Sequence, residues 1–356
     1  MEPLNATAVV KDGFCEIWIG CQSPLSFRQA VADSLGFEVE NVTLNNCFMG
    51  GGFGRKSRPD YAVQAAQLAA KVGRPVQLIW SREEDVQQDF YRPAVQSRFR
   101  GALDEAGNLT AWENTYAGKM EPVEAPLISY TVAAKEIGHV ASPTHVPLGA
   151  WRSVDHSQHG FFTESFIDEV AVAAGQDSYE YRAARLKHLP RQLAVLRKAA
   201  TEAQWDVPLA PGRGRGIALQ ESFGSIVAEV VEVTVNNGNL SVDRVVAVID
   251  AGYAISPDGM KAQIESGIIY GLSAALYGEI TIKDGAVAQS NFHDYPSVRM
   301  SKAPAIETHI INSGEVMGGA GEPGTPPIAP ALANAIFNAT GERIRQLPIK
   351  NSALKV

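Results

Sequence analysis

The sequence predicts an α+β fold made of two domains, and three observations lead to this prediction. Short stretches of alternating apolar and polar residues, typical of half-buried strands, are interspersed with segments whose apolar residues recur at helical spacing. Turn sequences that favour antiparallel hairpins separate several of the strands. A stretch rich in Pro and Gly at 208–216, PLAPGRGRG, is the best linker candidate, so we expect domains at 1–208 and 209–356.

The first domain is expected to mix helices with antiparallel pairs of strands. Strands are predicted where apolar residues alternate, and the segment DEAGN at 104–108 is a hairpin turn between two of them. Helices are predicted where spacing is helical, with Ser26 as a possible N-cap of the first and Gly73 and Pro75 ending the second. The predicted strands are 6–10, 14–20, 42–48, 76–80, 97–102 and 109–116, and the helices are 26–35, 61–71, 161–174, 179–188 and 191–203.

The second domain begins with a clear hairpin. Strands at 225–235 and 240–249 flank the turn NNGN, which favours a tight connection. A helix of small and apolar residues follows at 262–276, and a last helix ends at Thr340, where Gly341 provides the stop.

The composition limits the classes of partner. A chain of 356 residues with 45% hydrophobic residues can bury a core, and its formal charge of −8 argues against nucleic acid and anionic lipid. Its three cysteines, Cys15, Cys21 and Cys47, show no C-x-x-C spacing, so no disulfide framework, zinc site or iron–sulfur site is predicted. No apolar run is long enough to span a membrane, and no signal decides between periplasm and cytoplasm.

The segment GGGFG at 50–54 stands between a predicted strand and a predicted helix. Consecutive backbone N–H groups at a helix start suit an anionic or oxo-rich ligand, although a tight turn alone also explains the glycines. The loop has neither the G-x-G-x-x-G spacing of dinucleotide-binding folds nor the GK[ST] of a P-loop. A nicotinamide-dependent oxidoreductase is therefore disfavoured.

Two further features could carry chemistry. Glu322 lies between Gly321 and Pro323, where it is either an exposed turn residue or a carboxylate with little freedom that points into a cavity and acts as a general base. His156 and His159 have helical spacing, but hydrogen-bonded imidazoles explain them better than a metal site, and no metal ligand is predicted.

Several ordered segments resemble the molybdopterin-binding catalytic subunit of the xanthine dehydrogenase and aldehyde oxidase family. The resemblance is strongest to the isoquinoline 1-oxidoreductase β-subunit branch and covers nearly the whole chain. It rests on MEPLNATA, MGGGFGRK, GRPVQLIWSREED, DFYRPA, GAWRSVDHSQHGFFTESFIDEVA, GRGRGIALQESFGS, IESGIIYGLSAALYGEIT, NFHDYP and GGAGEPGTPPIAPALANAIFNATG.

The resemblance implies roles for particular residues. Glu322 matches the general base that activates a water-derived oxygen for attack on the substrate carbon, and Gln22 matches the glutamine whose amide reaches the apical oxygen of molybdenum. The cofactor-binding residues that it implies are Gly51, Gly52, Phe53, Gly54, Arg152, Gln263 and Gly321. Exposed positions for Gln22 and Arg152, the latter paired with Asp155, are the alternative.

The resemblance also implies cofactors and partners. It implies a molybdenum–molybdopterin cofactor in the cytosine dinucleotide form, a small [2Fe-2S] subunit, a downstream electron acceptor and a small-molecule substrate. The family subunit is about twice as long, and this chain lacks the M-G-Q-G segment of the upstream half, so we expect that half as a partner.

Two departures bear on the substrate. Purine-oxidising relatives carry a glutamate where this chain has Ser57, so an aldehyde or an N-heteroaromatic compound is the expected substrate. The segment around Arg152 lacks two glycines and a proline of the family pattern, which implies a different channel wall. A cofactor-free scaffold or inactive fragment of the same fold remains the alternative function.

Overall fold

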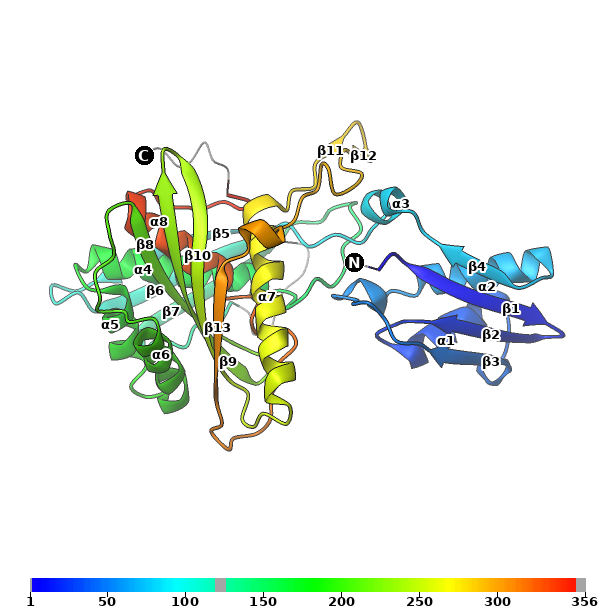
Figure 1. Ribbon diagram of the computed structural model, residues 1–356, viewed down its shortest axis with the longest axis horizontal. Coiled ribbons are helices and arrows are strands. Elements are labelled where there is room, and N and C mark those ends of the chain that lie inside the picture. The colour runs from blue at the N-terminus through cyan, green and yellow to red at the C-terminus, as the bar shows by residue number, and fades with distance from the viewer. Residues whose placement is uncertain (1, 119–125, 350–356) are drawn as a thin grey trace. The chain divides into compact units, whose positions relative to one another are not determined.

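The computed structural model describes residues 2–118 and 126–349, which form two compact units (Figure 1). The first unit consists of Met1–Pro93, Thr144–Arg152 and Ile280–Tyr295, and the second of Ala94–Pro143, Ser153–Glu279 and Pro296–Val356. The predicted domain boundary between residues 208 and 209 lies inside the second unit. This boundary therefore does not coincide with the division into compact units, and the two domains stay a prediction.

The first unit is a four-stranded sheet with two helices on one face. Its elements are β1 (Asn5–Lys11), β2 (Phe14–Ile19), α1 (Pro24–Leu35), η1 (Val39–Asn41), β3 (Val42–Asn46), η2 (Arg55–Ser57), α2 (Asp60–Val72), β4 (Val76–Ile79), α3 (Arg82–Gln87), β11 (Ile282–Lys283) and β12 (Ala286–Val287). The strand order is β3-β2-β1-β4. Ile17 and Ile19 of β2 are buried with Phe27 of α1 and Tyr61 of α2, whereas Trp18 is partly exposed, as alternation predicts.

The second unit contains the larger core. Its elements are β5 (Gln96–Leu103), β6 (Leu109–Gly118), β7 (Ala134–Ala141), α4 (His156–Ala173), α5 (Ser178–Arg185), α6 (Pro190–Glu202), β8 (Arg213–Ser222), β9 (Ser225–Asn236), β10 (Asn239–Asp250), α7 (Pro257–Tyr277), η3 (Met300–Lys302), β13 (Ala305–Ile311) and α8 (Ile328–Thr340). One sheet has the order β13-β10-β9-β8, and a second has the order β5-β6-β7.

The larger sheet is covered on both faces. Along β9, Val227 and Val231 pack into one apolar cluster with α7 and α8, while Ala228 and Val230 pack into another with α5 and α6. A strand buried on both faces reads as a continuous apolar run, which explains the sequence SIVAEVVEVTV.

The predicted α+β class is confirmed, and each predicted helix or strand has an observed counterpart whose ends are shifted. The sequence analysis did not predict the observed elements α3, β7, β8, β11, β12 and β13. α1 begins at Pro24 with Ser23 as its N-cap, so the N-cap expected at Ser26 is wrong; proline suits the first helical position. The predicted linker is partly wrong too, because β8 begins at Arg213.

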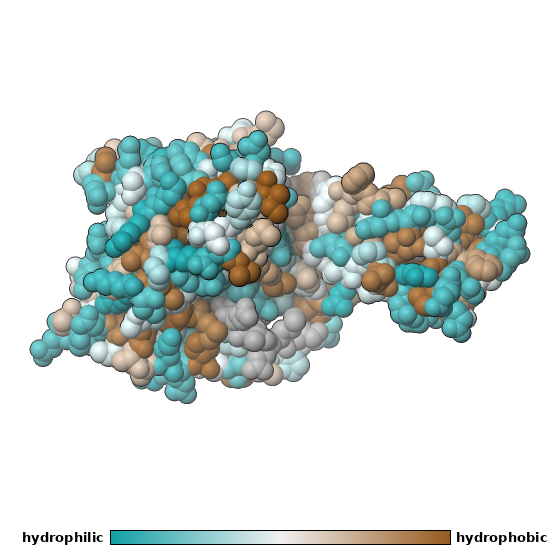
Figure 2. All heavy atoms as spheres, turned by 90° about the horizontal axis from the view of Figure 1, so that it is seen from below, coloured by the Kyte–Doolittle hydropathy of each residue, from teal (hydrophilic) through white to brown (hydrophobic). Residues whose placement is uncertain are grey.

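The face of the chain seen in Figure 2 carries both hydrophilic and hydrophobic residues. On the face seen in Figure 2, polar residues alternate with smaller apolar areas. Within the described ranges, 2–118 and 126–349, no helix has the length and apolar character that crossing a bilayer requires.

Candidate functional site

The glycine-rich loop between β3 and η2 is a tightly packed turn. Gly51 and Gly54 have φ values of 103° and 97°, which glycine adopts without strain, and Phe53 between them has a φ of 49°. A Cβ atom on Gly54 would lie 2.2 Å from the carbonyl oxygen of Ala150. Packing against the Thr144–Arg152 segment therefore requires glycine at position 54.

Gln22 lies against this loop. Its backbone N–H donates to the carbonyl of Lys56 at 2.9 Å, and its side-chain Oε1 accepts a hydrogen bond from the N–H of Gly54 at 3.0 Å. A Cβ atom on Gly52 would lie 2.5 Å from that Oε1. The structure thus brings together Gln22 and the loop residues that the sequence singled out.

Some of the loop N–H groups already have protein partners. Gly50 donates to the carboxylate of Glu2, which also pairs with the buried ammonium of Lys56. Gly54 donates to Gln22, as described, and Arg55 donates to the carbonyl of Gly52 at 2.8 Å. The tight-turn interpretation therefore accounts for much of the loop.

Arg152 is buried in the first unit, with 5% of its surface exposed. Its guanidinium lies 5.8 Å from the centroid of the Phe53 ring, which is a cation–π distance. The residue before Arg152, Trp151, makes the same kind of contact, because the guanidinium of Arg92 lies 4.3 Å from the centroid of its ring. Arg152 is thus part of the packing around the glycine-rich loop rather than a surface residue.

Glu322 is held by the turn that precedes α4. The N–H of Ser153 donates to Glu322 Oε1 at 2.9 Å, and the Ser153 hydroxyl donates to the Glu322 carbonyl oxygen at 2.7 Å. Glu322 is partly buried. Ser153 and Val154 have φ values of 75° and 39°, and a β-branched residue in this region is a strained outlier of the kind that clusters at functional sites.

Gly321 and Gln263 lie together in the second unit. A Cβ atom built on Gly321 would meet a single protein atom within 4 Å, the Oε1 of Gln263 at 3.9 Å. The φ of Gly321 is not positive, so neither backbone strain nor protein packing requires glycine there. Gln263 is exposed on α7.

The turn after β10 is fixed by charge. Asp250 pairs with Arg191 at 2.7 Å and accepts a hydrogen bond from the N–H of Gly252 at 2.8 Å. Burial opposes ionisation of this carboxyl, but these donors together lower the pKa of Asp250 below its usual value. Asp250 therefore serves as a structural anion that holds the turn.

The histidine pair belongs to the packing of α4. Burial lowers the pKa of His159 to about 4, and its ring contacts Tyr116 edge-on at 4.8 Å. Among the residues that the structure describes, no group of His, Cys, Asp and Glu side chains could hold a metal ion.

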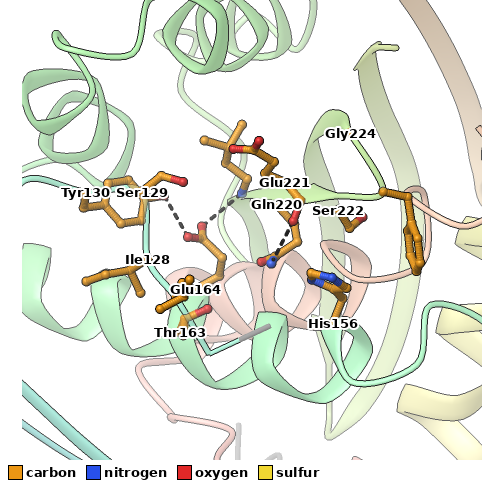
Figure 3. Close-up of a pocket in the computed structure, with 13 residues that line it drawn as sticks. Ile128, Ser129, Tyr130, His156, Thr163, Glu164, Gln220, Glu221, Ser222 and Gly224 are labelled. Atoms are coloured by element: carbon orange, nitrogen blue, oxygen red, sulfur yellow. Dashed lines mark hydrogen bonds between the residues drawn. The ribbon is translucent and has the colours of Figure 1, made fainter. Parts of the chain in front are cut away.

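Two features escaped the sequence analysis. One is Ser153, which lies 169 residues from its partner Glu322, so no local pattern could have indicated it. The other is a pocket of about 380 Å³ in the second unit (Figure 3). It is lined by Leu127, Ile128, Ser129, Tyr130, His156, Thr163, Glu164, Leu219, Gln220, Glu221, Ser222, Phe223 and Gly224.

Comparison with solved structures supports the fold. Quinoline 2-oxidoreductase from Pseudomonas putida 86 superposes with a TM-score of 0.84 at 16% identity, covering 99% of this chain and 74% of that one. The aldehyde oxidoreductase from Desulfovibrio gigas superposes with a TM-score of 0.81 at 18% identity, covering 98% of this chain and 58% of that one. Identities this low establish the fold alone.

Sequence comparison identifies the family. Two family models, both described as molybdopterin cofactor-binding domain, match residues 1–186 and 167–304. The β subunit of isoquinoline 1-oxidoreductase from Brevundimonas diminuta is 32% identical over 98% of this chain and 48% of its own length. The chain spans about half the length of the curated relatives it matches. The resemblance expected from the motifs is confirmed, and the chain belongs to the molybdopterin cofactor-binding family of oxidoreductases.

Proposed function

We propose that this chain carries the general base of a molybdenum hydroxylase that oxidises an aldehyde or an N-heteroaromatic carbon with oxygen derived from water. The observation that supports this most is the placement of Glu322. A carboxylate that is partly buried and oriented by a backbone N–H and a serine at a strained turn has the geometry of a general base. The names of the relatives support the substrate class.

The residues of the chain fit a molybdopterin group. A Cβ atom on Gly321 would have one protein atom within 4 Å, the Oε1 of Gln263, so there is open space beside this glycine. A flat group could lie against the backbone there. Gln263 beside it offers an amide, which both donates and accepts hydrogen bonds. In the first unit, we assign Gly51, Gly52, Phe53, Gly54 and the buried Arg152 to the cofactor as well.

Gln22 is assigned to an oxygen ligand of the metal. Because its Oε1 accepts the Gly54 N–H, the amide nitrogen is the end left to donate a hydrogen bond outward. The glycine at position 52 leaves room for this side chain. The loop therefore fixes the direction in which Gln22 presents its donor.

Glu322 is assigned to proton transfer. The Ser153 N–H holds Oε1, so we assign Oε2 as the oxygen that takes the proton from the attacking water-derived oxygen. When bound, the molybdenum cofactor supplies the Lewis acid and the electron acceptor for the oxidation. The hydrogen bond from the Ser153 hydroxyl to the Glu322 carbonyl limits movement of the carboxylate.

The partners follow from what this chain lacks. Its three cysteines are too few and wrongly spaced for a [2Fe-2S] cluster, so we assign electron transfer to a separate [2Fe-2S] subunit and a downstream acceptor. The curated relatives are about twice as long, so we propose that the equivalent of their unmatched half completes the cofactor site. We propose the cytosine dinucleotide form of the cofactor.

The role of Glu322 is tested by Glu322→Gln in the assembled, cofactor-loaded complex. The amide keeps the shape of the side chain but cannot take up the proton, so we expect turnover of a heteroaromatic or aldehyde substrate to fall at least about a thousandfold. Molybdenum content, measured in the same preparation, should not change.

Glu315→Gln is the matched control, because Glu315 is exposed in the segment that leads to Glu322. It should turn over substrate at the normal rate. If Glu322→Gln retained more than a tenth of the activity while Glu315→Gln behaved normally, Glu322 would not be the base.

A further inference from the structure

A buried ion pair adjoins the glycine-rich loop of the first unit. Lys56 of η2 is only 2% exposed, and its ammonium pairs with the carboxylate of Glu2, which lies 54 residues earlier in the chain. A buried ammonium is unfavourable without such a partner, because it has lost its hydration. Neither residue is assigned to the cofactor or to proton transfer in the proposed function.

The pair is connected to both ends of the loop. Glu2 accepts a hydrogen bond from the N–H of Gly50, the first glycine, and Lys56 follows Gly54 by two residues. A Cβ atom on Gly50 would lie 3.1 Å from Oε2 of Glu2 and 3.2 Å from the Cβ of Glu2, which is closer than ordinary van der Waals contact. Gly50 does not have a positive φ, so the approach of Glu2 explains this glycine better than backbone conformation does.

The segment that the pair holds carries both attachments of Gln22. The carbonyl oxygen of Lys56 accepts the backbone N–H of Gln22 at 2.9 Å, and Oε1 of Gln22 accepts the N–H of Gly54 at 3.0 Å. A shift of the segment from Gly54 to Lys56 would therefore move the backbone and the side chain of Gln22 together.

Glu2 is itself held by the core of the first unit. Leu4, two residues later, is 2% exposed within that core, and the amide of Asn5 donates to the Glu2 carboxylate at 3.1 Å. Burial opposes ionisation of Glu2, but the Lys56 ammonium and two hydrogen-bond donors, on Gly50 and Asn5, lower its pKa below the usual value. The carboxylate is thus charged at neutral pH and fixed relative to the sheet.

Net stability is a weak explanation for this arrangement. In a buried ion pair, the lost hydration of both charges offsets much of their attraction, and a well-packed apolar pair is often as stable. An apolar pair could not accept the N–H of Gly50, whereas the Glu2 carboxylate accepts it and the ammonium together. What the pair adds is therefore orientation of the loop.

We infer that Glu2 and Lys56 are positioning residues, whose ion pair fixes the glycine-rich loop and thereby the direction in which Gln22 presents its amide. This inference rests on the proposed role of Gln22, to which it adds two residues that act through it.

Amide hydrogen exchange, measured by NMR on the purified full chain, tests this positioning without cofactor or turnover. In Lys56→Met, which removes the charge from a side chain of similar length, the N–H groups of Gln22 and Gly54 should exchange at least about tenfold faster. Those of β1 should keep their rates, because the sheet does not depend on the pair. Glu2→Gln should accelerate the same two N–H groups about threefold or more, since its amide oxygen can still accept one hydrogen bond.

Unchanged exchange at Gln22 and Gly54 in both folded variants would overturn the inference. An equal acceleration in β1 would overturn it too, because the pair would then only stabilise the unit. Lys71→Met on α2 and Glu16→Gln on β2 make the same chemical changes at exposed positions and should alter both rates by less than about twofold. Similar acceleration in these controls would show that the effect is not specific to the pair.

Turnover of the assembled, cofactor-loaded complex tests the route through Gln22. Lys56→Met should lower kcat about tenfold and leave KM within about twofold, because Gln22 is assigned to an oxygen ligand of the metal and not to the substrate. Added to Gln22→Ala, it should cause no further loss, and additive losses would overturn the route. If Gln22→Ala left turnover unchanged, the proposed role of Gln22 would fail, while the exchange rates would still decide whether the pair positions it.

Discussion

At the scale of single residues, glycine is required at positions 52 and 54 for different reasons. A methyl group on Gly52 would meet the end of the flexible Gln22 side chain, which can move away. A methyl group on Gly54 would meet the backbone of Ala150, which cannot, and its φ of 97° is unfavourable for any other residue. A substitution at Gly52 is therefore expected to affect function through Gln22, whereas a substitution at Gly54 is expected to affect folding of the loop.

Gly52→Ala should reduce turnover with little effect on stability. Displacement of Gln22 breaks the hydrogen bond that its Oε1 accepts from the Gly54 N–H, and we expect a loss of about tenfold or more in turnover of the assembled complex. A Gln22→Ala/Gly52→Ala double variant should be no slower than Gln22→Ala alone, because both changes act through one side chain. Additive losses would mean that Gly52 acts independently of Gln22.

Gly54→Ala should instead destabilise the first unit. We expect a loss of about 2–4 kcal/mol in the free energy of unfolding, from the clash with the Ala150 carbonyl and from the positive φ. Denaturant unfolding measures the free energy of unfolding of both variants, Gly52→Ala and Gly54→Ala. A Gly54→Ala chain as stable as Gly52→Ala would contradict this steric account.

The sequence could indicate Gln22, the loop and Glu322 because each lies in a recognisable local motif. It could not indicate the partners that orient them. Ser153 reaches Glu322, and Ala150 reaches Gly54, only after the chain has folded. Glu2 and Lys56 lie within quoted motifs, yet their pairing is a property of the folded chain.

At the scale of elements, local turn chemistry was predictable and packing between distant segments was not. The hairpin of β9 and β10 follows from NNGN, where Asn237 and Gly238 adopt the positive φ values that a tight turn requires. The parallel pairing of β10 with β13 joins strands separated by the whole of α7, so no turn signal announces it.

The misassigned linker has a physical explanation. A Cβ atom on Gly214 or Gly216 of β8 would lie 2.2 Å from backbone atoms of Ala335 in α8. The glycines in PLAPGRGRG therefore allow a helix to pack closely on a strand. In the sequence alone, glycine needed for close packing looks the same as glycine in a flexible connection.

β9 carries an acidic residue that its position does not favour. Glu229 is fully buried between Ala218 and Ala247 on the neighbouring strands, and neither carboxylate oxygen has a hydrogen-bond partner among the described residues. Burial raises the pKa of Glu229 well above its usual value, which favours the neutral form of this carboxyl in the folded chain.

Glu229→Met should stabilise the second unit by about 1–3 kcal/mol at pH 7, because it replaces an unsatisfied polar group with an apolar one of similar size. The unfolded chain releases the proton of Glu229 above its ordinary pKa while the folded chain retains it, so wild-type stability falls as pH rises. The stabilisation by Glu229→Met, measured as the free energy of unfolding in denaturant, should therefore be larger at pH 8 than at pH 5. Glu136→Met, at an exposed position of β7, serves as the control. If Glu229→Met stabilised the chain no more than Glu136→Met, or destabilised it, Glu229 would not be an unfavourable buried carboxyl.

At the scale of the whole molecule, the chain represents about half of the polypeptide found in its curated relatives. Its two units hold different parts of the predicted residue set, with Gln22 and the glycine-rich loop in the first and Gly321, Glu322 and Gln263 in the second. Family and fold could be predicted because the motifs occur in order along nearly the whole chain. The compact units could not, since each is assembled from three separate segments.

The central claim is that this chain works within a molybdenum enzyme, and molybdenum content tests it most directly. The chain is affinity-purified from its native host with the polypeptides that remain attached, and the metal is quantified by elemental analysis. We expect one molybdenum per chain, together with a polypeptide that matches the other half of the relatives and a [2Fe-2S] subunit. An intact complex that contains no molybdenum would contradict the account and would favour a scaffold role for the same fold.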